Sequence, residues 1–122
     1  MKLRIKGNSI RLRLLQSEVK RLESTGTISE ETRFGIRTDQ TLKYSIAVTD
    51  GVDELSTEFS DNQILVMLPE TMAVAWCRGD EVGLEKTIEI DGETQLHVLV
   101  EKDLECIGRP DDPDRADAFP HP

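Results

Sequence analysis

The chain has 122 residues, of which 32% are charged and 4% aromatic, and its formal net charge is −9. This length corresponds to one domain that can bury about two thirds of its unfolded surface, and the scarcity of aromatic residues predicts a core of Ile, Leu and Val. The net negative charge argues against non-specific binding to nucleic acid, because Lys and Arg supply most of that affinity by neutralising phosphates.

The first 26 residues combine a strand pattern, a turn and a helix pattern. Residues 2–14 alternate aliphatic and basic side chains about Gly7-Asn8, which predicts a β-hairpin with one aliphatic and one basic face. Ser17 is expected to cap a helix that carries Glu18 in its first turn and ends at Gly26. Residues 1–22 hold seven basic side chains and one acidic side chain, whereas residues 23–122 hold eight basic and 23 acidic ones. The opening is therefore a basic segment of an acidic chain.

The middle of the chain predicts four strands. Residues 27–37 and 41–49 alternate apolar and polar side chains, and their short connection favours antiparallel pairing. Residues 54–60 form the next candidate strand, which the Asp61-Asn62 turn separates from a continuous apolar run at 64–68. A strand that is apolar on both faces is expected to be central in its sheet.

A second helix and a second hairpin are expected next. Pro69 and Glu70 suit the first turn of a helix, Gly79 ends it, and Trp76 with Met72 should pack it onto the sheet. Residues 83–100 predict a hairpin about Asp91-Gly92. The predicted fold class is thus α+β, with a single antiparallel sheet of about six to eight strands and two short helices in one domain at 1–107.

The C-terminal residues 108–122 hold four of the five prolines and show no periodicity, so we expect an extended or disordered tail. Phe119 is its one aromatic residue. It could anchor the tail to its own domain, which we favour, or enter a groove on a partner.

Several stretches resemble a family of small uncharacterised bacterial proteins. They are KLRIKGNSIRLRLLQSEV at the start, Leu68-Pro69-Glu70 followed by Trp76, LVEKDLECI at 99–107, and the closing residues 117–122. The resemblance runs nearly end to end. Because that family has no known function, it implies no catalytic or binding residue, but it implies a bacterial cytoplasmic protein whose residues 117–120 belong to the domain pattern.

One group of side chains could bind an anion: Lys2, Arg4, Lys6, Arg11 and Arg13. Strand alternation places all five on one face of the hairpin, where they could converge on a phosphate. The competing interpretation, which we favour, is pairing across strands with carboxylates such as Glu30 and Glu31. Strands of triphosphate-processing tunnel folds are similarly basic, but their Glu-x-Glu-x-Lys strand is missing here.

The remaining reactive residues predict no catalytic or metal site. Cys77, His97, Cys106 and His121 lack the spacing of zinc ligands, and Cys77 is expected to be a small buried residue at a helix end. Cys106 lies beside Asp103 and Glu105, which should raise its pKa. No disulfide, signal peptide or membrane span is expected, so we predict a cytoplasmic protein without a cofactor.

The prediction for function follows mainly from these absences. We expect a small non-enzymatic binding or interaction protein, whose partner is an unknown protein or a small anionic ligand, and no nucleic acid or membrane. The alternative is an enzyme or sensor that binds a phosphorylated small molecule through the basic hairpin.

Overall fold

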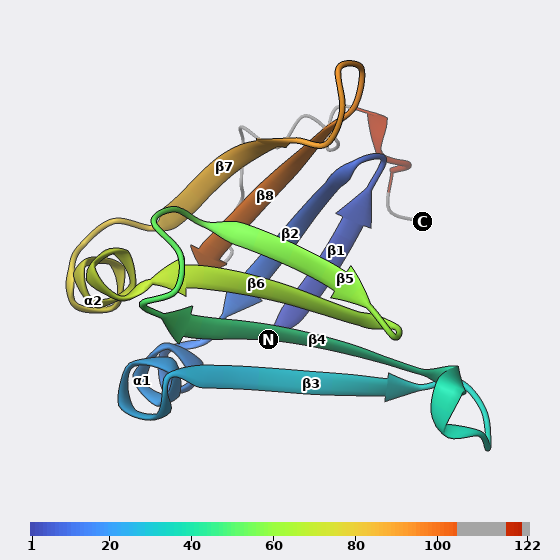
Figure 1. Cartoon of the computed structure of the whole chain (residues 1–122), viewed down its shortest axis with the longest axis horizontal. Helices are drawn as coiled ribbons and strands as arrows, with labels where there is room; N and C mark the ends of the chain where they lie inside the picture. The colour runs from blue at the N-terminus through green and yellow to red at the C-terminus, as the bar shows by residue number, and fades with distance from the viewer. Residues whose placement is uncertain (105–116, 121–122) are drawn as a thin grey trace.

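The computed structural model describes residues 1–104 and 117–120. Two four-stranded sheets face each other, and both helices lie at one end of them (Figure 1). The elements are β1 (Lys2–Lys6), β2 (Ser9–Leu14), α1 (Gln16–Thr25), β3 (Thr27–Arg33), the 3₁₀ turn η1 (Thr38–Gln40), β4 (Thr41–Thr49), β5 (Ser56–Ser60), β6 (Gln63–Pro69), α2 (Glu70–Arg78), β7 (Gly83–Glu89) and β8 (Gln95–Lys102).

Both sheets are mixed, which corrects the prediction of a single antiparallel sheet. The first sheet, called sheet A, has the order β1-β2-β8-β7, and the second, sheet B, has the order β3-β4-β6-β5. In each sheet the two central strands run parallel: β2 with β8, and β4 with β6. The outer pairs are hairpins. The prediction failed because hairpin signals are local, whereas the parallel pairs join segments that are distant in the sequence.

The predicted hairpins themselves are confirmed. β1 and β2 pair antiparallel about Gly7, whose φ of 54° suits glycine, and β7 and β8 pair across residues 90–94. β3 pairs antiparallel with β4, and β6 is a central strand as its apolar run indicated. Asp61 and Asn62 form the tight turn before β6, with φ values of 50° and 61°.

The core lies between the two sheets and under the helices. Its fully buried side chains come from both sheets and both helices: Leu12, Leu14, Leu22, Ile46, Val66, Leu68, Trp76, Val98 and Val100. Trp76 is 0% exposed, and its indole N–H donates to the carbonyl of Val82 at 3.2 Å. Met72 is half-buried against the same cluster, so the predicted packing of α2 is confirmed.

The start of α1 differs from the prediction. The helix begins at Gln16 with Leu15 as its N-cap residue, so Ser17 lies inside the first turn. The carboxylate of Glu18 accepts a hydrogen bond from the Leu15 amide at 2.9 Å, which satisfies a donor that the helix leaves open. Gly26 ends the helix at φ 81°, as predicted.

The fold contains an internal repeat that the sequence does not display. Lys2, Ser9 and Gln16 begin β1, β2 and α1, and Ser56, Gln63 and Glu70 begin β5, β6 and α2, in each case 54 residues later. β3 and β4 have β7 and β8 as counterparts. The registers of the parallel pairs are equivalent too, since Ser9 lies opposite His97 and the counterparts Gln63 and Lys43 lie opposite each other. Each half thus contributes one hairpin to each sheet, and the halves are related by a pseudo-twofold axis.

Of the predicted tail, the structure describes only residues 117–120. Phe119 is 96% exposed, so its ring does not pack on the described residues. The predicted fold-back of Phe119 is therefore wrong for this part of the chain. The other tail residues, with Cys106 and His121, lie outside the described ranges.

Candidate functional site

The five predicted basic side chains share the outer face of the β1–β2 hairpin. We call this surface the basic face: Lys2, Arg4, Lys6, Arg11 and Arg13. Their apolar neighbours in the alternation, Leu12 and Leu14, are buried on the inner face, which turns the cations outward. Lys2 lies opposite Arg13 and Arg4 opposite Arg11 in the antiparallel register. Like charges placed directly opposite each other on a sheet are destabilising.

Two carboxylates from the far end of the chain lie against this face. Glu101 on β8 is opposite Arg13 in the parallel register, and its Oε1 lies 2.6 Å from Arg13 Nε and 3.7 Å from Arg11 Nε. Asp103 Oδ2 lies 3.3 Å from Lys2 Nζ. Only 12% of the Glu101 side chain and 15% of the Asp103 side chain are exposed. Both carboxylates are therefore largely shielded from solvent where they contact the cations.

Sequence reasoning chose other partners for these cations. Glu30 and Glu31 are on β3 in sheet B, and Glu30 contacts the amino group of Met1 instead. Glu101 and Asp103 were missed because only the parallel pairing of β2 with β8 brings them close. The alternation of Glu101 with apolar residues indicates which face of its strand it occupies, but it does not indicate which strand lies next to it in the sheet.

The internal repeat shows what this scaffold does without the basic face. The counterparts of the five cations in sheet B are Ser56, Glu58, Ser60, Leu65 and Met67. Glu101 has Ala47 as its counterpart. The same backbone arrangement thus forms in sheet B without any of the five cations and without a counterpart of the Glu101 carboxylate; the one charged residue at these positions is Glu58. The fold by itself does not require the basic face.

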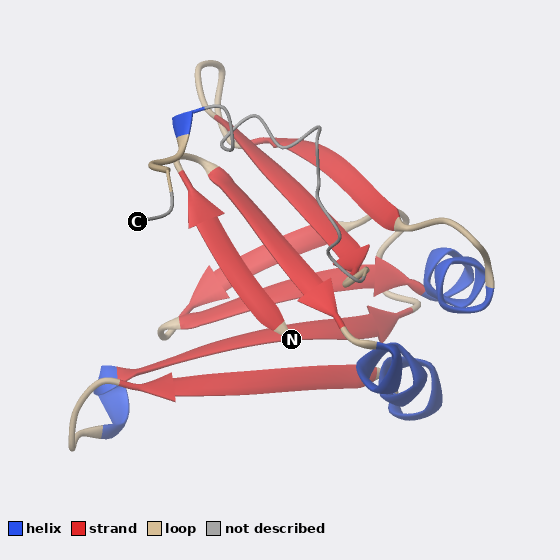
Figure 2. Ribbon diagram, turned by 180° about the vertical axis from the view of Figure 1, so that it is seen from behind, coloured by secondary structure: helices blue, strands red, loops and turns tan. Residues whose placement is uncertain are grey.

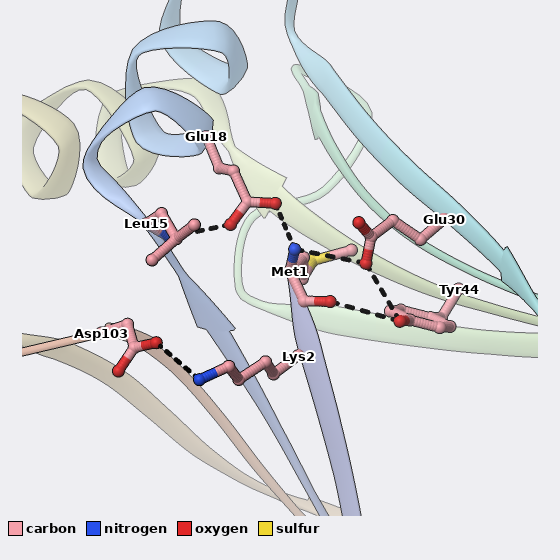
Figure 3. A network of polar contacts seen from close by, with 7 residues as sticks. All are labelled: Met1, Lys2, Leu15, Glu18, Glu30, Tyr44 and Asp103. Carbon is pink, nitrogen blue, oxygen red and sulfur yellow. Dashed lines mark hydrogen bonds and ion pairs between the residues drawn. The ribbon is translucent and has the colours of Figure 1, made fainter.

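A buried ionic network anchors the start of β1 (Figure 3). The α-amino group of Met1 is fully buried and contacts the carboxylates of Glu18 on α1 and, at 3.2 Å, Glu30 on β3. The Tyr44 hydroxyl lies 3.0 Å from Glu30 Oε2 and 3.2 Å from the Met1 carbonyl oxygen, so its one proton serves two acceptors. This network joins β1 to α1, β3 and β4, and it fixes the strand that carries Lys2, Arg4 and Lys6.

The network shifts two pKa values. Burial raises the pKa of the Glu18 carboxyl, but hydrogen bonds from the Met1 ammonium and the Leu15 amide outweigh it and leave the pKa below its ordinary value. Burial and the nearby Glu30 carboxylate raise the pKa of Tyr44. Glu18 is therefore charged and Tyr44 neutral at pH 7. In the second half the counterparts of Glu18 and Tyr44 are Met72 and Val98, so this network occurs in one half of the repeat.

The cysteine and histidine side chains that the structure describes lie apart. Cys77, on α2, is half-buried and lines a groove of about 460 Å³ with Leu22, Glu23 and Glu70. Burial raises the pKa of its thiol, and the Glu23 carboxylate adds to the effect, which opposes the thiolate that a nucleophile needs. His97 is exposed on β8, where its Nδ1 lies 3.0 Å from the Thr87 hydroxyl. Among residues 1–104 and 117–120, no three His, Cys, Asp or Glu side chains form a group that could hold a metal ion.

Comparison with known proteins places the chain in a family. No curated protein and no solved structure matches it. Neither helix in the described part of the chain has the length and apolar character needed to cross a membrane. A family model, described as a family of unknown function (DUF7009), matches residues 1–122, which confirms the resemblance noted in the sequence. The chain therefore belongs to the family of unknown function DUF7009.

Proposed function

We propose that this protein is a non-enzymatic binding protein that holds an acidic ligand on its basic face. The observation that carries the proposal is the contrast between the two halves of the repeat. Five cations occupy one outer face, and Ser56, Glu58, Ser60, Leu65 and Met67 occupy the equivalent positions of the other. The scaffold accepts quite different residues at these positions, yet the face on sheet A carries five like charges. We infer that these charges serve binding rather than folding.

The electrostatics of the face support an added anion. Arg4 and Arg11 lie directly opposite each other, and Glu101 contacts Arg11 and Arg13 while Asp103 contacts Lys2. Like charges that lie directly opposite each other weaken a sheet. A bound anion would remove that repulsion.

The shape of the face indicates an extended ligand. Lys2, Arg4 and Lys6 are spaced two residues apart, so this row spans about 13 Å at the rise of a β-strand. Arg11 and Arg13 form a second row about 5 Å away. An acidic peptide segment can follow both rows at once. A single phosphate would contact two or three of the five side chains, and a compact phosphorylated molecule is the alternative ligand.

A thermal-shift comparison tests the proposal. The melting temperature should rise with a poly-glutamate peptide or with inorganic triphosphate, beyond the rise in sodium chloride of equal ionic strength. A ligand at 100 times its Kd stabilises a protein by about 2.7 kcal/mol, which corresponds to several degrees. The variant with Arg4→Gln and Arg11→Gln should lose this rise, because two of the five cations of the basic face are then gone.

A matched control removes the same charge elsewhere. Lys20→Gln with Arg21→Gln takes two cations from the exposed side of α1 and should leave the anion response intact. A larger response to triphosphate than to the peptide would favour the compact ligand. An equal rise in chloride, or a response that survives Arg4→Gln with Arg11→Gln, would contradict the proposal.

A cytoplasmic location belongs to the same proposal. The location follows from the expectation, made from the sequence, that the cysteines are reduced. Cys77, the cysteine that the structure describes, has a free thiol.

A further inference from the structure

The end of the molecule away from the helices, called here the open end, exposes apolar side chains. The β1–β2, β3–β4, β5–β6 and β7–β8 connections all lie there, and the two sheets diverge toward it (Figures 1 and 2). Five large apolar side chains on these connections and the adjoining strand ends are solvent-exposed: Ile5 by 58%, Phe34 by 74%, Ile36 by 89%, Phe59 by 71% and Ile90 by 57%. Ile5 and Phe59 continue the inward-facing alternation of β1 and β5 beyond the point where the opposite sheet covers it.

Four of these five residues occupy equivalent positions in the repeat. Ile5 corresponds to Phe59, and Phe34 corresponds to Ile90. A single exposed apolar side chain is ordinary, but a set of five around one opening marks an interaction surface. Phe59 and Ile90 line an apolar cleft of about 390 Å³, which Ile10, Ile64 and Leu96 line as well. The surface is therefore concave as well as apolar.

The charges around the open end differ between the halves. Arg33, at the end of β3, corresponds to Glu89 at the end of β7. Arg33 donates to the carbonyl oxygens of Gly35 and Ile36 at 2.9 and 2.7 Å, and no carboxylate among the described residues pairs with it. Glu89 accepts from the Gln95 amide at 3.0 Å and has no cation partner in the described part of the chain. At this pair of equivalent positions, the open end is thus basic in the first half of the repeat and acidic in the second half.

The acidic side of the open end holds further carboxylates. Glu58 lines the apolar cleft beside Phe59, and Glu93 lies in the β7–β8 loop. Both are exposed. On the first half, Arg37 accompanies Arg33, although Asp39 pairs with it at 2.9 Å. The rim therefore has one basic and one acidic side arranged about the pseudo-twofold axis.

We propose that the open end binds the open end of a second copy of this chain. A twofold dimer brings the same surface of both copies together, so that surface must be complementary to itself. The proposed twofold rotation places the first half of each copy on the second half of the other. Arg33 of each copy then approaches Glu89 of the other copy, which gives two such pairs. The same arrangement covers Ile5 and Phe34 with Phe59 and Ile90 of the partner. Apolar contact supplies affinity, and the divided charge fixes the orientation.

Sedimentation equilibrium over a range of micromolar concentrations tests this dimer. The wild type should show a monomer–dimer equilibrium, and Phe59→Ser with Ile90→Ser should weaken it at least about tenfold. Both replaced side chains are exposed, so the melting temperature of the monomer should hardly change. The control, Val74→Ser with Val82→Ser, removes exposed apolar side chains near the helices and should leave dimerisation intact.

Charge exchange tests the orientation. Arg33→Glu alone and Glu89→Arg alone should each weaken self-association, because like charges then face each other in the homodimer. An equimolar mixture of these two variants should recover a dimer, since each copy then offers the charge that the other lacks. A wild type that stays monomeric, a dimer that survives Phe59→Ser with Ile90→Ser, or a mixture that shows no recovery would each overturn the proposal.

Discussion

Glu18 offers the sharpest test of how the first strand is held. Glu18→Gln keeps an oxygen that can accept from the Leu15 amide but removes the charge that faces the buried Met1 ammonium. Breaking a buried ion pair destabilises by about 3–5 kcal/mol. Because Glu30 remains 3.2 Å from the ammonium, we expect the lower end, about 3 kcal/mol. For a domain of this size that lowers the melting temperature by roughly 10 °C.

The pH dependence separates this ion pair from a packing effect. The pKa of Glu18 is lower in the folded than in the unfolded protein, so its stabilisation is complete above the unfolded pKa of about 4.3 and disappears as pH falls through the folded value. The stability difference between wild type and Glu18→Gln, measured by urea unfolding, should therefore be constant near neutral pH and shrink below pH about 4.3. Lys20→Gln, an exposed change on the same helix, is the control. A difference under about 0.5 kcal/mol at pH 7 would refute the reasoning, as would one that does not vary with pH.

Three further substitutions probe the packing, the basic face and a turn. Trp76→Ala empties the largest fully buried position and should lower the free energy of unfolding by about 3–5 kcal/mol, which a urea titration would register. Glu101→Gln removes the carboxylate that Arg11 and Arg13 share, so it should enlarge the stabilisation by triphosphate or poly-glutamate in the thermal-shift assay; an unchanged response would place the ligand elsewhere. Gly26→Ala puts a side chain at φ 81° with no atom within 4 Å, so only backbone strain opposes it, and thermal melting should report a loss of about 1–2 kcal/mol.

Local features of this fold could be predicted from the sequence. The hairpin about Gly7, the end of α1 at Gly26 and the burial of Trp76 each follow from residues within one or two turns of each other. Strand alternation also placed the five cations on one face. These predictions succeed because side-chain period and backbone conformation are properties of short segments.

The pairing of distant strands could not be predicted in the same way. Alternation specifies which side chains of β2 face inward, but it does not distinguish β8 from β3 as a neighbour. The repeat was hidden because its opening segments share few identities, Asn8 with Asn62, Ile10 with Ile64 and Leu14 with Leu68 among them. What the halves share is apolar character at buried positions, which many sequences satisfy. The partners Glu101 and Asp103 of the basic face were missed for that reason.

The shared sheets have a consequence for how the chain folds. Each sheet needs the last strand of one half beside the second strand of the other, so neither half can complete a sheet alone. Pairing β2 with β8 closes a loop of most of the chain length, and the entropy of that closure opposes folding until the core forms. Folding should therefore be slow for a domain of this size and proceed as one cooperative event. We expect the four hairpins to form early and the two sheets to be completed only when the hairpins associate. A chain leaving the ribosome acquires β8 last, so the parallel pairing of β2 with β8 must wait for Gln95–Lys102, whereas β4 can pair with β6 as soon as Gln63–Pro69 has emerged.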